Sequence, residues 1–161
     1  MSLILHIARH AKASSQDYFP GDFYRTLDKD GYSEGAAIAA RFVAVKERPT
    51  LIVTSPAIRA YSTALLFADR LAYPMSRIEL NFSVYDALAS TLLNVVREWH
   101  HENKNVMLFG HNPGVTDLVN YLCGPVEFGM ATAQIVSIDI NCGSWSEVQE
   151  NSGKVVQSIK P

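Results

Sequence analysis

Short apolar runs and amphipathic stretches alternate along most of this chain. Runs of apolar residues that end in polar or turn-forming residues predict buried strands at residues 3–8, 51–54 and 105–110. Apolar residues at helical spacing predict helices at residues 32–46, from Ser55 to about 71, and at 92–99. Ser55 is expected to cap the second of these helices, with Pro56 in its first position. This alternation of strand and helix is typical of the α/β class.

The remaining segments complete this pattern. Residues 9–31 form a long stretch without periodicity, and a loop of that length in a compact domain is usually functional. A short helix is expected at residues 116–122, where Gly124 and Pro125 end it. β-Branched residues and weaker apolar runs predict further strands at residues 78–80, 134–140, 147–150 and 155–159.

Length and composition narrow the class of protein. The chain has 161 residues, of which 48% are hydrophobic, so we expect residues 1–161 to form a single domain with one sizeable core. Fourteen Lys and Arg stand against 16 Asp and Glu, giving a net charge of −2. A nucleic-acid protein needs clustered positive charge, so we expect no nucleic-acid partner.

The lack of a recognisable targeting signal and the small number of cysteines bear on the location of the protein. The first residues lack the basic region and long apolar stretch of a signal peptide, and no run of about 18 apolar residues occurs, so no membrane association is expected. Two cysteines, Cys123 and Cys142, indicate neither a disulfide scaffold nor a zinc cluster. A cytoplasmic location fits these features best.

Basic side chains follow three of the predicted strands. Arg9 and His10 follow the first strand, Arg59 follows the second, and His111 follows the third. Open α/β sheets bind ligands outside the carboxyl ends of their strands, so these four side chains should converge there. Converging cations need an anion between them, and a phosphoryl group suits the paired donors of arginine. No Walker-type glycine loop or Mg²⁺-binding carboxylate cluster is visible, so neither a cofactor nor a metal is expected.

Four segments resemble a known family. Residues 5–13 contain Arg-His-Ala-Lys, which resembles the Arg-His motif of the histidine phosphatase superfamily in the form found in SixA-type phosphohistidine phosphatases. Residues 54–64 are similar to the second motif of that family, and residues 110–114, Gly-His-Asn-Pro-Gly, to its third. Residues 22–31 resemble its Asp-x-x-Arg-Pro-Leu-Thr segment, with Thr26 in place of the proline.

The resemblance implies a fold and a division of roles. The family has a three-layer α/β sandwich of the phosphoglycerate mutase type, with helices on both faces of a mixed, mostly parallel sheet. His10 would accept the phosphoryl group, since a neutral imidazole is a competent nucleophile. Arg9, Arg59 and a protonated His111 would hold the phosphoryl oxygens. Further substrate contacts are expected from Arg25, Lys12, Ser55 and Asn112, although Lys12 could equally be a solvent-exposed side chain.

The proton donor of the family has the weakest counterpart in this sequence. Asp86 lies in about the right region to act as the acid, but it could equally cap the helix that follows. A weak acid favours phosphohistidine, whose leaving group departs as neutral imidazole. We therefore expect a protein bearing phosphohistidine as partner and a phosphate or similar oxyanion in the site. The alternatives are a phosphatase of small phosphate esters, such as a sugar phosphate or nucleotide, and a binding module without catalysis.

Three other histidines are interpreted as non-catalytic: His6 as packed, and His100 and His101 as a solvated helix end. His6 lies inside the first predicted strand and is expected to be packed rather than catalytic. His100 and His101 fall on the predicted helix at 92–99 or at its end, where neighbouring side chains point about 100° apart and could not clamp one metal.

Overall fold

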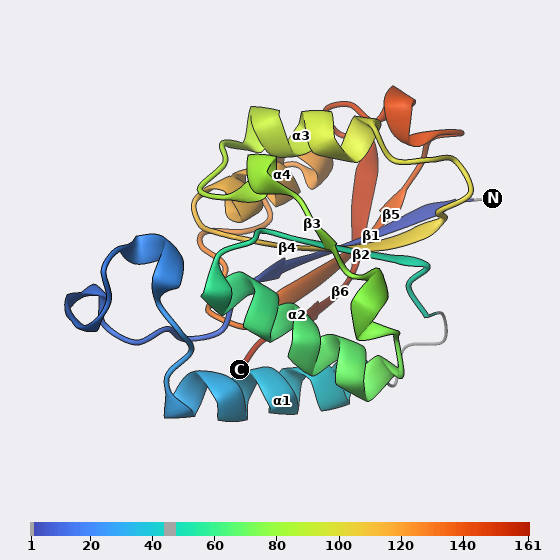
Figure 1. Cartoon of the computed structure of the whole chain (residues 1–161). Coiled ribbons are helices and arrows are strands. Elements are labelled where there is room, and N and C mark those ends of the chain that lie inside the picture. The colour runs from blue at the N-terminus through green and yellow to red at the C-terminus, as the bar shows by residue number, and fades with distance from the viewer. Residues whose placement is uncertain (1, 44–47) are drawn as a thin grey trace.

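The protein is built around one six-stranded sheet with helices on both faces (Figure 1). The computed structural model describes residues 2–43 and 48–161. The strands are β1 (Leu3–Arg9), β2 (Leu51–Thr54), β3 (Glu79–Leu80), β4 (Asn105–Gly110), β5 (Ile135–Ile140) and β6 (Gly153–Ile159). The helices are α1 (Lys29–Phe42), α2 (Ile58–Leu71), α3 (Ala89–Arg97) and α4 (Gly114–Cys123). The predicted α/β class is confirmed.

The sheet is mixed, and its parallel part carries the site. The strand order is β3-β2-β4-β1-β5-β6. The first four of these strands run parallel, whereas β5 is antiparallel to β1 and β6 is antiparallel to β5. In this register Arg9 lies beside Gly110 and Thr54 lies beside Phe109. The carboxyl ends of β1, β2 and β4 therefore lie next to one another.

Two layers of core hold the sheet between its helices. Leu5 and Ile7 of β1 pack with α3 and α4, whereas Ala8 packs with α1 and α2. Because successive side chains of a strand point to opposite faces, one short apolar strand supplies both layers. Figure 1 shows α1 and α2 below the sheet and α3 and α4 above it. This is the three-layer arrangement that the resemblance implied.

Several predicted boundaries differ from the structure. Helix α1 begins at Lys29 rather than at Tyr32, because the Asp28 side chain accepts a hydrogen bond from the Gly31 N–H and caps it. The described helix ends at Phe42, and residues 44–46 of the prediction lie outside the described residues. The helix after β2 starts at Ile58, so the predicted start at Ser55 and Pro56 is wrong.

Two predictions in the second half are also wrong. The expected strand at 147–150 is replaced by a 3-10 helix, η5 (Trp145–Glu147), followed by a turn. His100 and His101 do not lie on a helix, because α3 ends at Arg97 and both residues belong to the turn before β4.

Two glycines permit close backbone contacts beside the strand ends. A Cβ atom on Gly31 would lie 2.0 Å from the Lys12 carbonyl oxygen, and one on Gly114 would lie 2.0 Å from that of Ala87. Neither contact leaves room for a side chain, since backbone cannot shift as a flexible side chain can. Gly31 thereby fixes the loop after β1 against α1, and Gly114 fixes the start of α4 against the loop before α3.

None of the helices described in the structure is both long and apolar enough to cross a membrane.

Candidate active site

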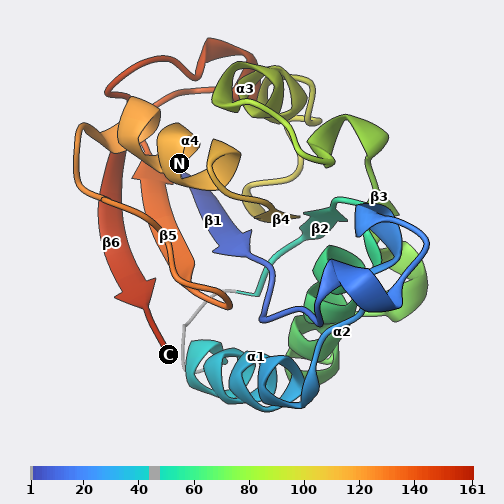
Figure 2. The same cartoon turned by 90° about the vertical axis from the view of Figure 1, so that its left-hand side faces the viewer.

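Three predicted site residues meet at the carboxyl edge of the parallel strands, which faces the viewer in Figure 2. His10 directly follows β1, His111 directly follows β4, and Arg59 lies in the first turn of α2, shortly after β2. Arg59 Nε donates to His10 Nε2 at 3.3 Å, and Arg59 Nη2 donates to His111 Nδ1 at 3.2 Å. One nearly buried guanidinium therefore lies between the two imidazoles.

The hydrogen bonds of His10 determine which ring nitrogen is free to react. His10 Nδ1 lies 2.7 Å from the Ala11 carbonyl oxygen, so Nδ1 carries the proton and donates it. Nε2 then holds the lone pair and faces Arg59. Burial lowers the pKa of His10 to about 4, and the charges of Arg59 and Arg9 add to this against the opposing effect of the Ala11 hydrogen bond. At neutral pH His10 is thus an uncharged base.

His111 is also neutral in the ligand-free protein. Arg59 can only donate, so His111 Nδ1 accepts and His111 Nε2 donates to the Ser55 hydroxyl at 2.8 Å. Burial, and then the charge of Arg59, lower the pKa of His111 to about 3. The expectation that a protonated His111 holds a bound phosphoryl group stays a prediction. An anion at this position would favour the protonated form, because a negative charge offsets both effects.

Arg9 borders the same site from the side of β5. Its Nη1 donates to the Met130 carbonyl oxygen at 2.8 Å, and its positive charge contributes to the low pKa values of His10 and His111. Its Nε is buried and has no hydrogen-bond partner among the residues that the structure describes. A buried donor without a partner is costly, so an acceptor placed there would be stabilised.

Ser55 and Asn112 support other parts of the site. The Ser55 hydroxyl accepts hydrogen bonds from His111 Nε2 and from the Ala57 N–H, so it holds the imidazole rather than capping α2. Asn112 Nδ2 donates to the same Met130 carbonyl oxygen that Arg9 contacts. These two side chains orient the basic groups and the loop around them.

The other two basic candidates are held by carboxylates. Arg25 Nη1 donates to Asp22 Oδ1 at 3.0 Å, and Arg25 also lowers the pKa of His10 by its charge. Lys12 is half exposed and forms ion pairs with Asp28 at 3.5 Å and Asp30 at 3.2 Å. Arg25 thus belongs to the edge of the site, whereas the structure pairs Lys12 with two carboxylates of the neighbouring loop and helix.

Asp86 lies at the rim of the site. Its carboxylate is 3.9 Å from Arg59 Nη2, and its side chain is 58% exposed. Asp86 has a φ of 46°, a left-handed conformation that Asp tolerates better than most residues. The alternative role as a helix cap is wrong, because Leu88 is the N-cap of α3 and makes no side-chain hydrogen bond there.

Asp22 is the first of two residues near Arg59 that the sequence analysis missed. It lies in the short helix η2 (Asp22–Tyr24), and its Oδ2 accepts from Arg59 Nη2 and from the Tyr85 hydroxyl, both at 2.8 Å. Its backbone oxygen accepts from Arg59 Nη1 at 2.7 Å. Partial burial acts to raise the pKa of Asp22, but hydrogen bonds from Tyr85, Arg25 and Arg59 outweigh it and lower the pKa to about 2.

The signal for Asp22 was present in the sequence. Asp22 opens the segment that resembles the Asp-x-x-Arg pattern, in which the sequence analysis predicts a substrate contact only for Arg25. A second missed residue is Thr63, one turn after Arg59, whose hydroxyl accepts from the Ala11 N–H and donates to the Arg59 carbonyl oxygen. Thr63 ties the loop after β1 to α2.

Comparisons with known proteins concern the fold of the whole chain. Neither the family models nor the curated proteins include a match to the chain. Solved structures do match. The SixA protein of Agrobacterium tumefaciens has a TM-score of 0.82 at 23% identity, over 100% of this chain and 99% of that one. A structure of the protein histidine phosphatase SixA complexed with tungstate has a TM-score of 0.79 at 22% identity, over 99% and 97% of the two chains.

A neighbour with a different substrate shares the fold as well. Mycobacterial glucosyl-3-phosphoglycerate phosphatase, in complex with inorganic phosphate, has a TM-score of 0.66 at 18% identity, over 96% of each chain. The class defined by these similarities is the phosphoglycerate mutase-like α/β fold. Within it, the chain has the architecture of the SixA phosphatases, so the likeness read from the motifs is confirmed at the level of the fold.

Proposed function

We propose that this protein is a phosphatase that passes a phosphoryl group through His10, and that its substrate is phosphohistidine on a protein. The proposal extends to the site residues: His10 as nucleophile, with Arg9, Arg59 and His111 around the phosphoryl oxygens. It treats residues 1–161 as one domain acting in the cytoplasm, where the unpaired thiols of Cys123 and Cys142 are stable.

The orientation of His10 carries this proposal. The Ala11 carbonyl fixes the proton on Nδ1, and Nε2 points its lone pair at the guanidinium of Arg59. A buried, neutral imidazole nitrogen that faces the Arg59 guanidinium, with the charge of Arg9 also acting on the ring, suits attack on a phosphorus atom whose oxygens these arginines neutralise. A binding module would need the positive charges but not the free nitrogen.

Two displacements at phosphorus complete the reaction. His10 Nε2 forms a bond to phosphorus while the bond from phosphorus to the substrate nitrogen breaks, and the leaving imidazole keeps the electron pair. Arg59 Nε, released from His10, can then donate to a phosphoryl oxygen. Water next attacks the phosphorylated His10, and inorganic phosphate and free His10 result. The positive charge needed in both steps is present on arginine side chains.

The rim of the site favours phosphohistidine over esters. An alkoxide leaving group needs a proton, but Asp86 is largely exposed and lies next to Arg59, and Tyr85 has its pKa raised to about 12 by burial and by Asp22. The Tyr85 hydroxyl donates its proton to Asp22 and is therefore a poor general acid, and Asp86 is open to solvent rather than enclosed beside His10. When the substrate is a phosphohistidine protonated on its other ring nitrogen, the leaving group is a neutral imidazole and needs no such donor.

Phosphate esters are the second candidate substrate. The similarity to mycobacterial glucosyl-3-phosphoglycerate phosphatase supports them. A comparison of turnover on a phosphorylated histidine-containing domain with turnover on sugar phosphates and nucleotides decides between the two. Fast turnover of esters with none of phosphohistidine would replace our choice.

The covalent step is tested by replacing the nucleophile. We expect His10→Ala to abolish phosphate release, because His10 Nε2 forms the bond to phosphorus and alanine has no nucleophilic atom to replace it. Wild-type protein incubated with labelled substrate should carry acid-labile, base-stable label that the variant lacks. The same wild-type assay should be unaffected by EDTA, since arginines supply the charge. Full activity of His10→Ala would refute the covalent mechanism.

A further inference from the structure

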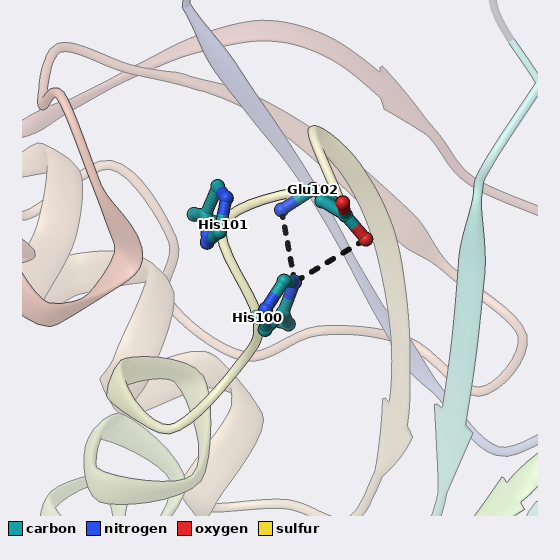
Figure 3. A group of neighbouring side chains, drawn as sticks. All are labelled: His100, His101 and Glu102. Carbon is teal, nitrogen blue, oxygen red and sulfur yellow. Dashed lines mark hydrogen bonds and ion pairs between the residues drawn. The ribbon is translucent and has the colours of Figure 1, made fainter.

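A second cluster of ligand-type side chains lies in the turn between α3 and β4. Figure 3 shows His100, His101 and Glu102 gathered around this turn, with His100 directed toward Glu102. Each of the three offers one ligand atom, and these atoms all lie within 4.8 Å of one another. All three side chains are exposed, and 61% of the His100 side chain and 80% of the Glu102 side chain are open to solvent.

The backbone of this turn is held at both ends. The Asn103 N–H donates to the His100 carbonyl oxygen at 3.0 Å, which closes the turn. Trp99, just before His100, packs edge to face against Trp145 at 5.2 Å between ring centroids. The indole N–H of Trp145 donates to the Asn103 carbonyl oxygen on the other side of the cluster. The three side chains thus project from an anchored backbone, which lowers the entropy lost on binding a ligand.

We propose that His100, His101 and Glu102 form a surface site for a borderline divalent transition metal, with Zn²⁺ as the reference ion. Two imidazole nitrogens and one carboxylate oxygen match the ligand preferences of Zn²⁺ and not those of Mg²⁺ or Ca²⁺. In a tetrahedral site with bonds of about 2.0–2.2 Å, neighbouring ligand atoms lie about 3.3 Å apart. Exposed side chains can close the remaining distance by rotation, and water would fill the fourth position.

This site is separate from the phosphoryl chemistry. The turn lies just before the first residue of β4, whereas His111 follows the last, so six strand residues, or about 20 Å, separate the two. The histidines of the candidate active site are buried beside arginines, which repel a cation. All three ligands come from one turn, so the metal would hold the conformation of that turn, and it would stabilise the folded chain by RT ln(1 + c/Kd), where c is the free Zn²⁺ concentration.

Calorimetric titration of the full chain with Zn²⁺ at about pH 7 tests the site. We expect one Zn²⁺ per chain, with an affinity at least about 100-fold lower in the double variant His100→Ala/His101→Ala and about tenfold lower in Glu102→Gln. Glu150→Gln removes another exposed carboxylate in a turn and should bind like wild type. Phosphatase activity of all these variants should equal that of wild type, so the result does not depend on the proposed function.

The two tryptophans provide an independent readout. Cu²⁺ at the cluster should quench the fluorescence of Trp99, its sequence neighbour, in wild type but not in the double histidine variant. Binding should weaken in acid, because imidazole must be neutral to coordinate a metal. The proposal is overturned if wild type shows no stoichiometric Zn²⁺ binding, if the double variant binds like wild type, or if Glu102→Gln retains full affinity.

Discussion

Two buried histidines, one inside β1 and one just after it, show how a packed histidine differs from one that is placed to react. His6 lies within β1, where its Nδ1 is 2.7 Å from the Ser137 hydroxyl and its Nε2 is 3.0 Å from Asn105 Oδ1. His10 follows β1, where its Nδ1 contacts a backbone carbonyl and its Nε2 faces Arg59. Burial is the largest cause of a lowered pKa in both cases, and both pKa values fall to about 4.

The difference lies in the partners and not in the pKa. His6 is surrounded by neutral partners that use both ring nitrogens, and the Phe42 ring packs edge to face against it. His10 has cationic neighbours, and one of its nitrogens faces a donor that a phosphoryl oxygen could take over. A lowered histidine pKa is therefore not evidence of catalysis, whereas convergence of cations on an unprotonated nitrogen is.

Among the variants that leave the nucleophile in place, the largest effect should come from removing the cation between the imidazoles. Arg59→Ala should cost about 2–4 kcal/mol of transition-state stabilisation, because a preorganised donor to the phosphoryl group is lost. The measurement is kcat/KM on the phosphohistidine substrate. Arg41→Ala removes an exposed arginine of α1, which donates to the Lys160 carbonyl oxygen, and serves as control. Equal losses in both variants would argue against a specific role of Arg59.

Acid should destabilise the folded protein through the same histidines. The unfolded chain binds protons at pKa 6.5 and the folded His6 only at about 4, so the unfolded state binds more protons between these values. Stability is complete above pH 6.5 and falls as the pH drops toward 4, by about 3 kcal/mol for this group. Urea unfolding across this range measures the slope.

Added phosphate should distinguish the histidines of the candidate active site, His10 and His111, from the packed His6. An anion beside His10 and His111 favours their protonated forms, so saturating phosphate should reduce their share of the acid destabilisation. It should leave the share of His6 unchanged. An identical slope with and without phosphate, in a protein shown to bind phosphate, would contradict the placement of the anion between these rings.

His6→Ala should affect stability without affecting catalysis. The variant leaves a cavity against Phe42 and removes the ring partner of Ser137, at a cost of about 2–3 kcal/mol in the free energy of unfolding. Denaturant unfolding gives this value, and kcat of the folded fraction should match that of wild type. A large fall in kcat at full folding would assign His6 to the site.

The smallest effect is expected at Asp22. Asp22→Asn retains the shape of the side chain but removes the charge that fixes Arg59 and Arg25, so we expect a loss of about 1–2 kcal/mol in kcat/KM. Tyr85→Phe removes only the hydroxyl donor to the same carboxylate and should cost less. A loss after Tyr85→Phe as large as that after Asp22→Asn would show that the charge of Asp22 is not what matters.

The pattern of apolar residues predicted the strands that end at the site. It did not predict the polar side chains that hold the catalytic groups in place. Apolar runs defined β1, β2 and β4, because a buried parallel strand must be apolar on both faces. The apolar pattern does not single out Asp22, since its partners Arg59 and Tyr85 lie 37 and 63 residues away and meet it only through the fold. The family resemblance of residues 22–31 is its signal in the sequence. Ser55 was misassigned because a serine before a proline has a local capping role, whereas here its hydroxyl binds a distant histidine.

The Arg59 guanidinium has consequences for which anions can enter. Of its five N–H groups, one is bound by His10, one by His111 and two by Asp22, so within the described residues a single hydrogen remains uncommitted. An incoming ion has to replace existing bonds and not merely fill empty ones. Chloride carries one diffuse charge and cannot replace the hydrogen bonds that it would displace, whereas a compact tetrahedral dianion can. Ordinary salt should therefore compete poorly for this site.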